Sequence, residues 1–135
     1  MSKAPMASGF LLDTHALQWW WCSPGLLSEP VQEVLRDPAQ RVVVSGASWF
    51  ELAAAYRAGQ LPGLEMALAR FPQLLEADGL DYLPVWPNHL QRAGRAAHFQ
   101  VDPWDALLVA QAELEDLQLI SVDSGLALLG ARVFW

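Results

Sequence analysis

The sequence predicts an α/β domain in which a short, mainly parallel sheet lies between layers of helices. Short apolar runs alternate with longer runs of helical periodicity along the whole chain, which is typical of parallel strands joined by helical crossovers. The runs RVVVS and LQLISV are apolar at successive positions, as expected of strands buried on both faces. A length of 135 residues with 53% hydrophobic residues is enough to form one domain with a substantial core.

The first half of the chain predicts two strands and three helices. GFLLD is an apolar run that stops at a carboxylate, and RVVVS holds three β-branched residues, so both are typical of buried strands. Ser28 is a preferred N-cap residue, and Ser48 with Glu51 matches the S-x-x-E capping box. The expected strands are residues 9–13 and 41–45, and the expected helices are residues 16–22, 28–37 and 46–59.

Three consecutive tryptophans, residues 19–21, lie in the first expected helix. Three successive helical positions span about 200°, so the three rings cannot all face one core. We expect at least one of them to be exposed, covered by a partner, or packed against a neighbouring helix.

The second half predicts three strands and four helices. Asp102, Pro103 and Asp105 form a strong helix start, with an N-cap acid, a proline at the first position and an acid in the first turn. Pro84 cannot donate to a β-ladder, so its strand is expected at an edge of the sheet. The expected strands are residues 81–86, 117–122 and 131–135, and the expected helices are residues 64–76 (interrupted near Pro72), 88–99, 102–114 and 124–130.

Composition and charge exclude several classes of protein. Only 17% of the residues are charged, which is unlike a disordered chain, and the sequence holds no apolar run long enough to span a membrane. The first residues do not resemble a secretory signal, and the single Cys22 excludes an internal disulfide and a cysteine-rich zinc site. We therefore expect a cytoplasmic protein with a flexible tail at residues 1–8 and a single domain at residues 9–135.

Four acids are expected at one edge of the sheet, since each lies where a strand ends or where a helix begins: Asp13, Glu51, Asp105 and Asp123. Each could simply cap a helix. Together, however, they lie where open parallel sheets bind ligands, and clustered carboxylates either keep a proton or bind a cation. An all-oxygen site favours Mg²⁺ or Mn²⁺ over zinc.

The formal net charge is −7, and Lys3 is the only lysine. A protein that holds nucleic acid by surface charge alone would be basic. A role on nucleic acid must therefore rest on arginines, on a metal ion or on a basic partner.

The sequence resembles the PIN-domain nucleases, and within them the VapC-type toxins of prokaryotic toxin–antitoxin pairs. The resemblance rests on LLDTHALQWWW, SGASWFELA, VDPWDALLVAQAELEDLQLISVDSGL and the closing RVFW, and it covers residues 10–135. It implies a three-layer α/β/α fold and a metal-dependent endoribonuclease that cuts RNA, often tRNA or rRNA, to leave a 5′-phosphate and a 3′-hydroxyl. It also implies a cognate antitoxin and a homodimer.

By this resemblance, Asp13, Glu51, Asp105 and Asp123 take the catalytic, metal-binding positions of the family. Thr14 matches a small hydroxyl residue that often follows the first acid, and Asp102 either supports the acids or caps its helix. Many relatives carry a histidine and an arginine where this chain has Gln100 and Ala106. These two differences bear on how tightly the chain binds its substrate and how strongly it cleaves it.

Three other interpretations remain to be distinguished. A PIN domain that binds without turnover would not need the full set of four acids. A phospho-acceptor signalling domain would need a lysine near its last strands, and no lysine follows Lys3. A phosphatase with an aspartate nucleophile would have a second aspartate where this chain has His15.

Overall fold

The computed structural model describes residues 8–61, 63–96 and 101–135. These residues form one five-stranded sheet with the strand order β3-β2-β1-β4-β5. Every strand pair is parallel, which confirms the predicted α/β class. The strands are β1 (Phe10–Leu12), β2 (Val42–Ser45), β3 (Asp81–Leu83), β4 (Gln118–Ile120) and β5 (Val133–Phe134).

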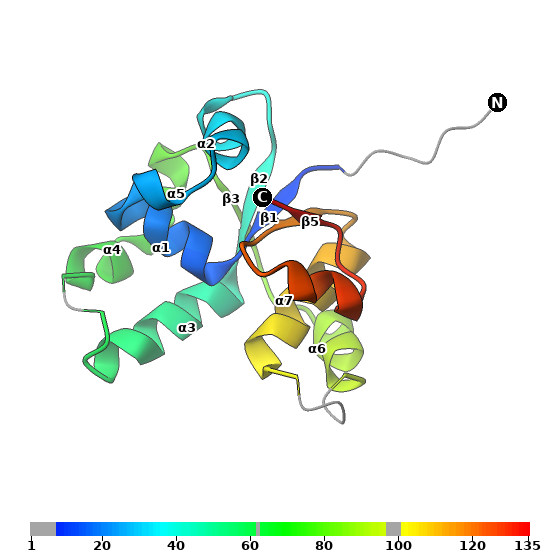
Figure 1. The fold of residues 1–135 in the computed structure, drawn as a ribbon. Helices are drawn as coiled ribbons and strands as arrows, with labels where there is room; N and C mark the ends of the chain where they lie inside the picture. The colour runs from blue at the N-terminus through cyan, green and yellow to red at the C-terminus, as the bar shows by residue number, and fades with distance from the viewer. Residues whose placement is uncertain (1–7, 62, 97–100) are drawn as a thin grey trace.

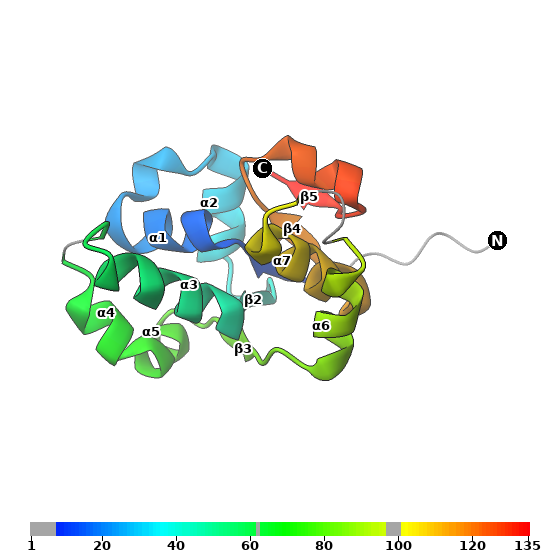
Figure 2. The same cartoon turned by 90° about the horizontal axis from the view of Figure 1, so that it is seen from below.

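Helices connect the strands and lie on both sides of the sheet (Figure 1). Figure 2 shows the same arrangement from below, with α1, α3, α6 and α7 around the strands. The helices are α1 (Thr14–Cys22), η1 (Pro24–Leu26), α2 (Glu29–Arg36), α3 (Gly46–Arg57), α4 (Glu65–Ala69), α5 (Phe71–Ala77), α6 (Pro87–Gly94), α7 (Pro103–Leu114) and η3 (Ser124–Leu129).

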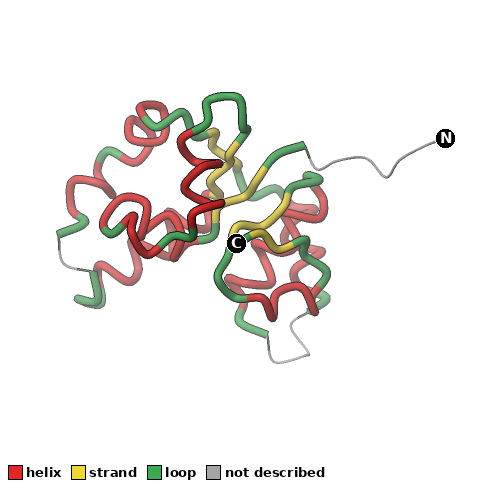
Figure 3. Tube along the Cα trace, turned by 45° about the horizontal axis from the view of Figure 1, so that its top comes forward, coloured by secondary structure: helices red, strands yellow, loops and turns green. Residues whose placement is uncertain are grey.

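The sheet divides the core into two apolar clusters, because successive strand residues point to opposite faces. On β1, Phe10 and Leu12 pack with α1, α2 and α5, whereas Leu11 packs with α7 and η3 on the other face. In Figure 3 the strands accordingly lie between two groups of helices. The predicted three-layer α/β/α sandwich is thus confirmed.

Some predicted elements are shorter or divided in the structure. The helix expected at 64–76, with an interruption near Pro72, is two helices that meet at Arg70, so that Pro72 falls in the first turn of α5, where a missing N–H costs nothing. The strand expected at 81–86 ends at Leu83, just before Pro84, and it is an edge strand as predicted. The helix expected at 88–99 begins at Pro87 and ends at Gly94, and residues 97–100 lie outside the described chain.

The capping box predicted at Ser48 and Glu51 is wrong. The N-cap of α3 is Ser45, three residues before Ser48, and the Ser45 side chain accepts a hydrogen bond from the Ala47 N–H at 3.0 Å. Ser48 therefore lies inside the helix, where it is fully buried. The Glu51 side chain is consequently free of a capping role.

The three tryptophans of α1 all pack against the core and are partly buried. Trp21 meets the edge of Phe71 on α5 with ring centroids 5.3 Å apart, and its Nε1 donates to Asp78 at 2.9 Å. Trp19 packs against Trp135. Of the arrangements expected, the structure therefore shows packing against a neighbouring helix for Trp21 and against the C-terminal residue for Trp19.

The ends of the described chain are held by hydrogen bonds and packing. Ser8 donates its N–H to the Asp116 carbonyl at 2.8 Å and its hydroxyl to the same oxygen at 3.0 Å. The tail predicted at residues 1–8 otherwise lies outside the described residues.

Within the described part of the chain, no helix has the length and apolar character needed to cross a membrane.

Asp102 caps α7 as the sequence predicts, accepting hydrogen bonds from Trp104 N at 2.8 Å and from Asp105 N at 3.1 Å. We expect Asp102→Ala to lower the free energy of unfolding by about 1 kcal/mol, since an N-cap acceptor is lost. Asp102→Asn keeps an oxygen acceptor and should lose much less. Urea unfolding of both variants at pH 7 tests this, and equal losses would contradict a capping role.

Candidate functional site

The four predicted acids lie around the carboxyl ends of the central strands. Asp13 follows β1 and caps α1, and Asp123 follows β4 and caps η3. The two strands are adjacent and parallel, with Leu12 opposite Ile120, and Asp13 N donates to the Ile120 carbonyl at 3.1 Å. Glu51 and Asp105 come from α3 and α7, which contact each other.

Asp13 is buried at the base of this group, with 8% of its surface exposed. Its Oδ1 accepts a hydrogen bond from Ala16 N at 2.8 Å. Burial raises the pKa of the Asp13 carboxyl above its usual value, and hydrogen bonds from Ser121 and Ala16 N act in the opposite direction. Asp13 thus combines a capping role with a carboxylate that is costly to ionise.

Asp105 carries the clearest electrostatic sign of the cluster. Its pKa is raised to about 6, first by burial and then by the negative charges of neighbouring acids, which are, in order of effect, Asp102, Asp123, Glu51 and Asp13. All three other candidate acids therefore lie within electrostatic reach of Asp105. A divalent cation among them would relieve this repulsion.

The carboxylates do not form a ready-made chelate. Among residues 8–61, 63–96 and 101–135, no group of three or more Asp, Glu, His or Cys side chains converges closely enough to hold a metal ion. The Oδ1 atoms of Asp13 and Asp123 instead accept hydrogen bonds from Ala16 N and Gly125 N. The donor set matches Mg²⁺ or Mn²⁺ by its charge and its oxygen chemistry, while the side chains of Asp13 and Asp123 are in capping positions.

Thr14 supports the cluster through a buried hydroxyl pair. Its Oγ1 lies 2.9 Å from Ser48 Oγ, and both side chains are buried between α1 and α3. This pair fixes the helix that carries Glu51 against the helix that Asp13 caps. Asp102 is exposed and caps α7, and its charge is the largest of the charged contributions to the raised pKa of Asp105.

Two serines contribute to the site that sequence reasoning did not assign. Ser48 pairs with Thr14, although the S-x-x-E pattern suggested a cap. Ser121 accepts from Asp123 N at 3.1 Å, and its hydroxyl lowers the pKa of Asp13 against the effect of burial, so it acts on both strand-end acids. A hydroxyl residue two positions before Asp123 at the end of a buried strand was the available signal.

The two residues that depart from the family pattern give little positive charge to the site. Ala106 is buried, with 6% exposed, in the position where many relatives have arginine. Gln100 lies outside the described residues. Within the described part of the chain, three arginines are already paired with acids, in the pairs Arg41–Asp81, Arg92–Glu113 and Arg132–Asp116.

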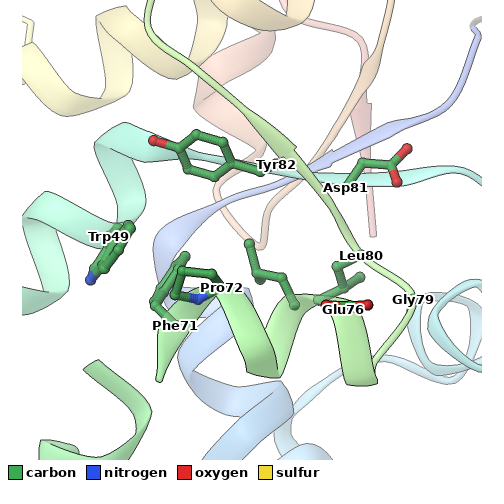
Figure 4. Close-up of a pocket in the computed structure, with 9 residues that line it drawn as sticks. Trp49, Phe71, Pro72, Glu76, Gly79, Leu80, Asp81 and Tyr82 are labelled. Atoms are coloured by element: carbon green, nitrogen blue, oxygen red, sulfur yellow. The ribbon is translucent and has the colours of Figure 1, made fainter. Parts of the chain in front are cut away.

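The structure also has an apolar cavity that none of the four acids lines. It has a volume of about 520 Å³ and lies between α3, α5 and the edge strand β3. Figure 4 shows Trp49, Phe71 and Tyr82 around it, with Asp81 pointing away. Trp49 and Phe71 stack with centroids 4.7 Å apart. The cavity contains none of the predicted site residues, so the acids, and not this cavity, define the candidate site.

Solved structures confirm the fold. The DNA-bound VapBC from Salmonella typhimurium is 19% identical with a TM-score of 0.70, and 93% of this chain and 96% of that chain are covered. VapBC2 from Rickettsia felis, bound to a promoter DNA fragment, is 14% identical with a TM-score of 0.68 over 93% and 96% of the two chains. A toxin–antitoxin complex from Klebsiella pneumoniae is 17% identical with a TM-score of 0.65 over 94% and 97%.

Among curated proteins, the comparison finds no match. The family model of the PIN domain matches residues 10–131, which include all four acids and both serines of the site. The chain therefore belongs to the PIN domain family.

Proposed function

We propose that this chain is the toxin of a VapC-type pair and that it cleaves RNA phosphodiester bonds with the help of Mg²⁺ or Mn²⁺. The observation that carries the proposal is the arrangement of four acids, with Asp13 and Asp123 following the adjacent strands β1 and β4, and Glu51 and Asp105 on the contacting helices α3 and α7. Burial and then the charges of Asp102 and of these neighbouring acids raise the pKa of Asp105 to about 6. Structural neighbours that are VapBC complexes support the toxin assignment.

In the proposed mechanism, Asp13, Glu51, Asp105 and Asp123 would hold the ion. The chemistry that a bound divalent ion would supply there is a lower pKa for a water nucleophile and stabilisation of the charge that develops on the phosphate. The Thr14–Ser48 hydroxyl pair keeps α1 and α3 in register, and Asp102 keeps the start of α7 in place. The ribose 2′-hydroxyl is not the nucleophile, so the products carry a 5′-phosphate and a 3′-hydroxyl.

Incubation of the purified chain with total tRNA and rRNA tests this proposal. We expect cleavage with Mg²⁺ or Mn²⁺, no cleavage in EDTA, and 5′-phosphate ends when the fragments are sequenced. Sequencing of RNA ends after brief expression of the chain without its partner would identify the target. Binding of RNA with no cleavage under any of these conditions would favour the PIN domain that binds without turnover.

A cognate antitoxin is the proposed partner, and a homodimer is the proposed assembly. Because the chain has a net charge of −7, the antitoxin should present a basic, arginine-bearing segment to the carboxylates. We expect the affinity to fall as NaCl rises from about 50 mM to about 500 mM, since exposed charge pairs are screened. Calorimetry over this range measures it, and a salt-independent affinity would contradict the proposed contact.

A further inference from the structure

An open hollow of about 380 Å³ lies between α3, the end of β3 and α7. Its walls are apolar or aromatic and carry no charged side chain; they include Phe50, Tyr82, Val85, Trp104 and Leu107. Gly46 forms part of the wall, and a Cβ on it would collide with the Tyr82 hydroxyl. The glycine thus lets Tyr82 lie close against the start of α3.

Two aromatic rings in this hollow form a pair with free surface. Phe50 and Trp104 have ring centroids 5.4 Å apart at an interplanar angle of 34°. Phe50 is 64% exposed and Tyr82 is 50% exposed, and together with Trp104 they form a contiguous aromatic patch of the kind that marks binding surfaces. Exposed aromatic faces bind nucleobases by stacking, without regard to sequence.

The ring pair is continuous with the carboxylate cluster. Phe50 directly precedes Glu51 on α3, and Trp104 directly precedes Asp105 on α7. The negative charge of Glu51 acts on Asp105. The contact between α3 and α7 therefore brings the two rings, Phe50 and Trp104, close to the two acids, Glu51 and Asp105. A nucleotide stacked on the rings would therefore be bound next to a phosphate that lies at the acids.

The charge of the chain favours a ring as the binding element. Fifteen acids face eight lysines and arginines, and the pairs Arg41–Asp81, Arg92–Glu113 and Arg132–Asp116 neutralise three of the arginines. Binding of RNA phosphates by electrostatic attraction alone is therefore weak. Stacking of an uncharged base in an uncharged hollow does not suffer from this repulsion.

We propose that Phe50 and Trp104 form a stacking platform for an unpaired base of the RNA, adjacent to the bond that is cut. This inference rests on the proposed function and deepens it, because it makes the substrate a single-stranded segment. Duplex RNA would not serve, since its bases are already stacked on one another. Purines should bind more tightly than pyrimidines because they offer the larger ring surface.

Binding in EDTA separates this platform from the cleavage chemistry. The probes are fluorescein-labelled oligo(A) of twelve nucleotides and an abasic twelve-mer that has the same charge but no bases. We expect the intact chain to prefer oligo(A). Phe50→Ala and Trp104→Ala should each weaken oligo(A) binding by about five- to hundredfold and leave binding of the abasic probe unchanged.

Two further variants distinguish stacking from a general apolar contact. Phe50→Tyr keeps the π-face and should bind like the intact chain, whereas Phe50→Leu keeps only apolarity and should bind like Phe50→Ala. Met66→Ala serves as the matched control, because Met66 is 68% exposed on α4 and is not part of the hollow.

A second copy of this chain could occupy the hollow instead of a base, and sedimentation of the same variants tests this alternative. If Phe50→Ala dissociates an oligomer while the preference for oligo(A) persists, the face belongs to that second copy and the inference is overturned. Equal weakening of both probes also overturns it. If the intact chain cleaves RNA but the ring variants bind normally, only this inference fails; if it neither binds nor cleaves any RNA, the proposed function fails first.

Discussion

Replacing Asp105 with asparagine is expected to reduce RNA cleavage by at least about 100-fold and, at the same time, to stabilise the fold. The loss of cleavage follows because a ligand to the ion supplies several kcal/mol of transition-state stabilisation. The gain in stability follows because the folded chain holds this carboxylate among other acids, with a pKa near 6. Cleavage assays in Mn²⁺ and urea unfolding in EDTA measure the two effects.

The gain in stability should depend on pH. The folded pKa of Asp105 is about 6 against an ordinary value of 3.8, so the folded state binds the proton more tightly than the unfolded state. The raised pKa therefore stabilises the folded state relative to the unfolded state below about pH 4, and this stabilisation is lost as the pH rises through about 6. Asp105→Asn should gain about 1 kcal/mol at pH 7.5, after allowance for solvent screening, and nothing at pH 4.

The matched control is Glu33→Gln, which removes an exposed acid on α2 and should change stability by less than about 0.5 kcal/mol. Added Mg²⁺ should stabilise the unaltered chain, since a ligand that binds only the folded state adds to stability. The difference in the free energy of unfolding between the unaltered chain and Asp105→Asn should therefore become smaller. A variant that is less stable than the parent at pH 7.5 would show that the acids do not repel one another around Asp105.

The placement of the strand-end acids was predictable because it depends on topology. Asp13 and Asp123 each follow a strand, and parallel strands bring such residues to one edge; in the structure they follow the neighbouring strands β1 and β4. The directions of their side chains were not predictable. Each carboxylate accepts a hydrogen bond from a helical N–H, and this local contact competes with convergence on a common point.

The fold was predictable where periodicity was strong and less so where a residue had two possible roles. Ser48 fits a capping pattern, but burial against Thr14 and the N-cap of α3 at Ser45 decide its role. This outcome depends on a contact between distant segments, which one sequence does not display. The interruption expected near Pro72, by contrast, is local, and the chain begins a new helix at Phe71.

Phe71→Ala is expected to lower the free energy of unfolding by about 3–5 kcal/mol, the usual cost of removing a buried ring. Phe71 is fully buried, stacks on Trp49 at 4.7 Å and meets the edge of Trp21 at 5.3 Å. It also lines the cavity of about 520 Å³, so its loss would open that cavity into the core. Domains of this kind are stable by about 5–15 kcal/mol, so much of the folded margin would disappear.

Phe50→Ala makes the same chemical change on an exposed ring and provides the control. With 64% of Phe50 exposed, its loss should cost less than about 1 kcal/mol, even though the ring contacts Trp104. Urea unfolding of the two variants under one set of conditions gives the comparison. A loss below about 1 kcal/mol for Phe71→Ala would mean that α5 does not close the core over β3. A large loss for Phe50→Ala would mean that its ring supports the fold and is not free to receive a base.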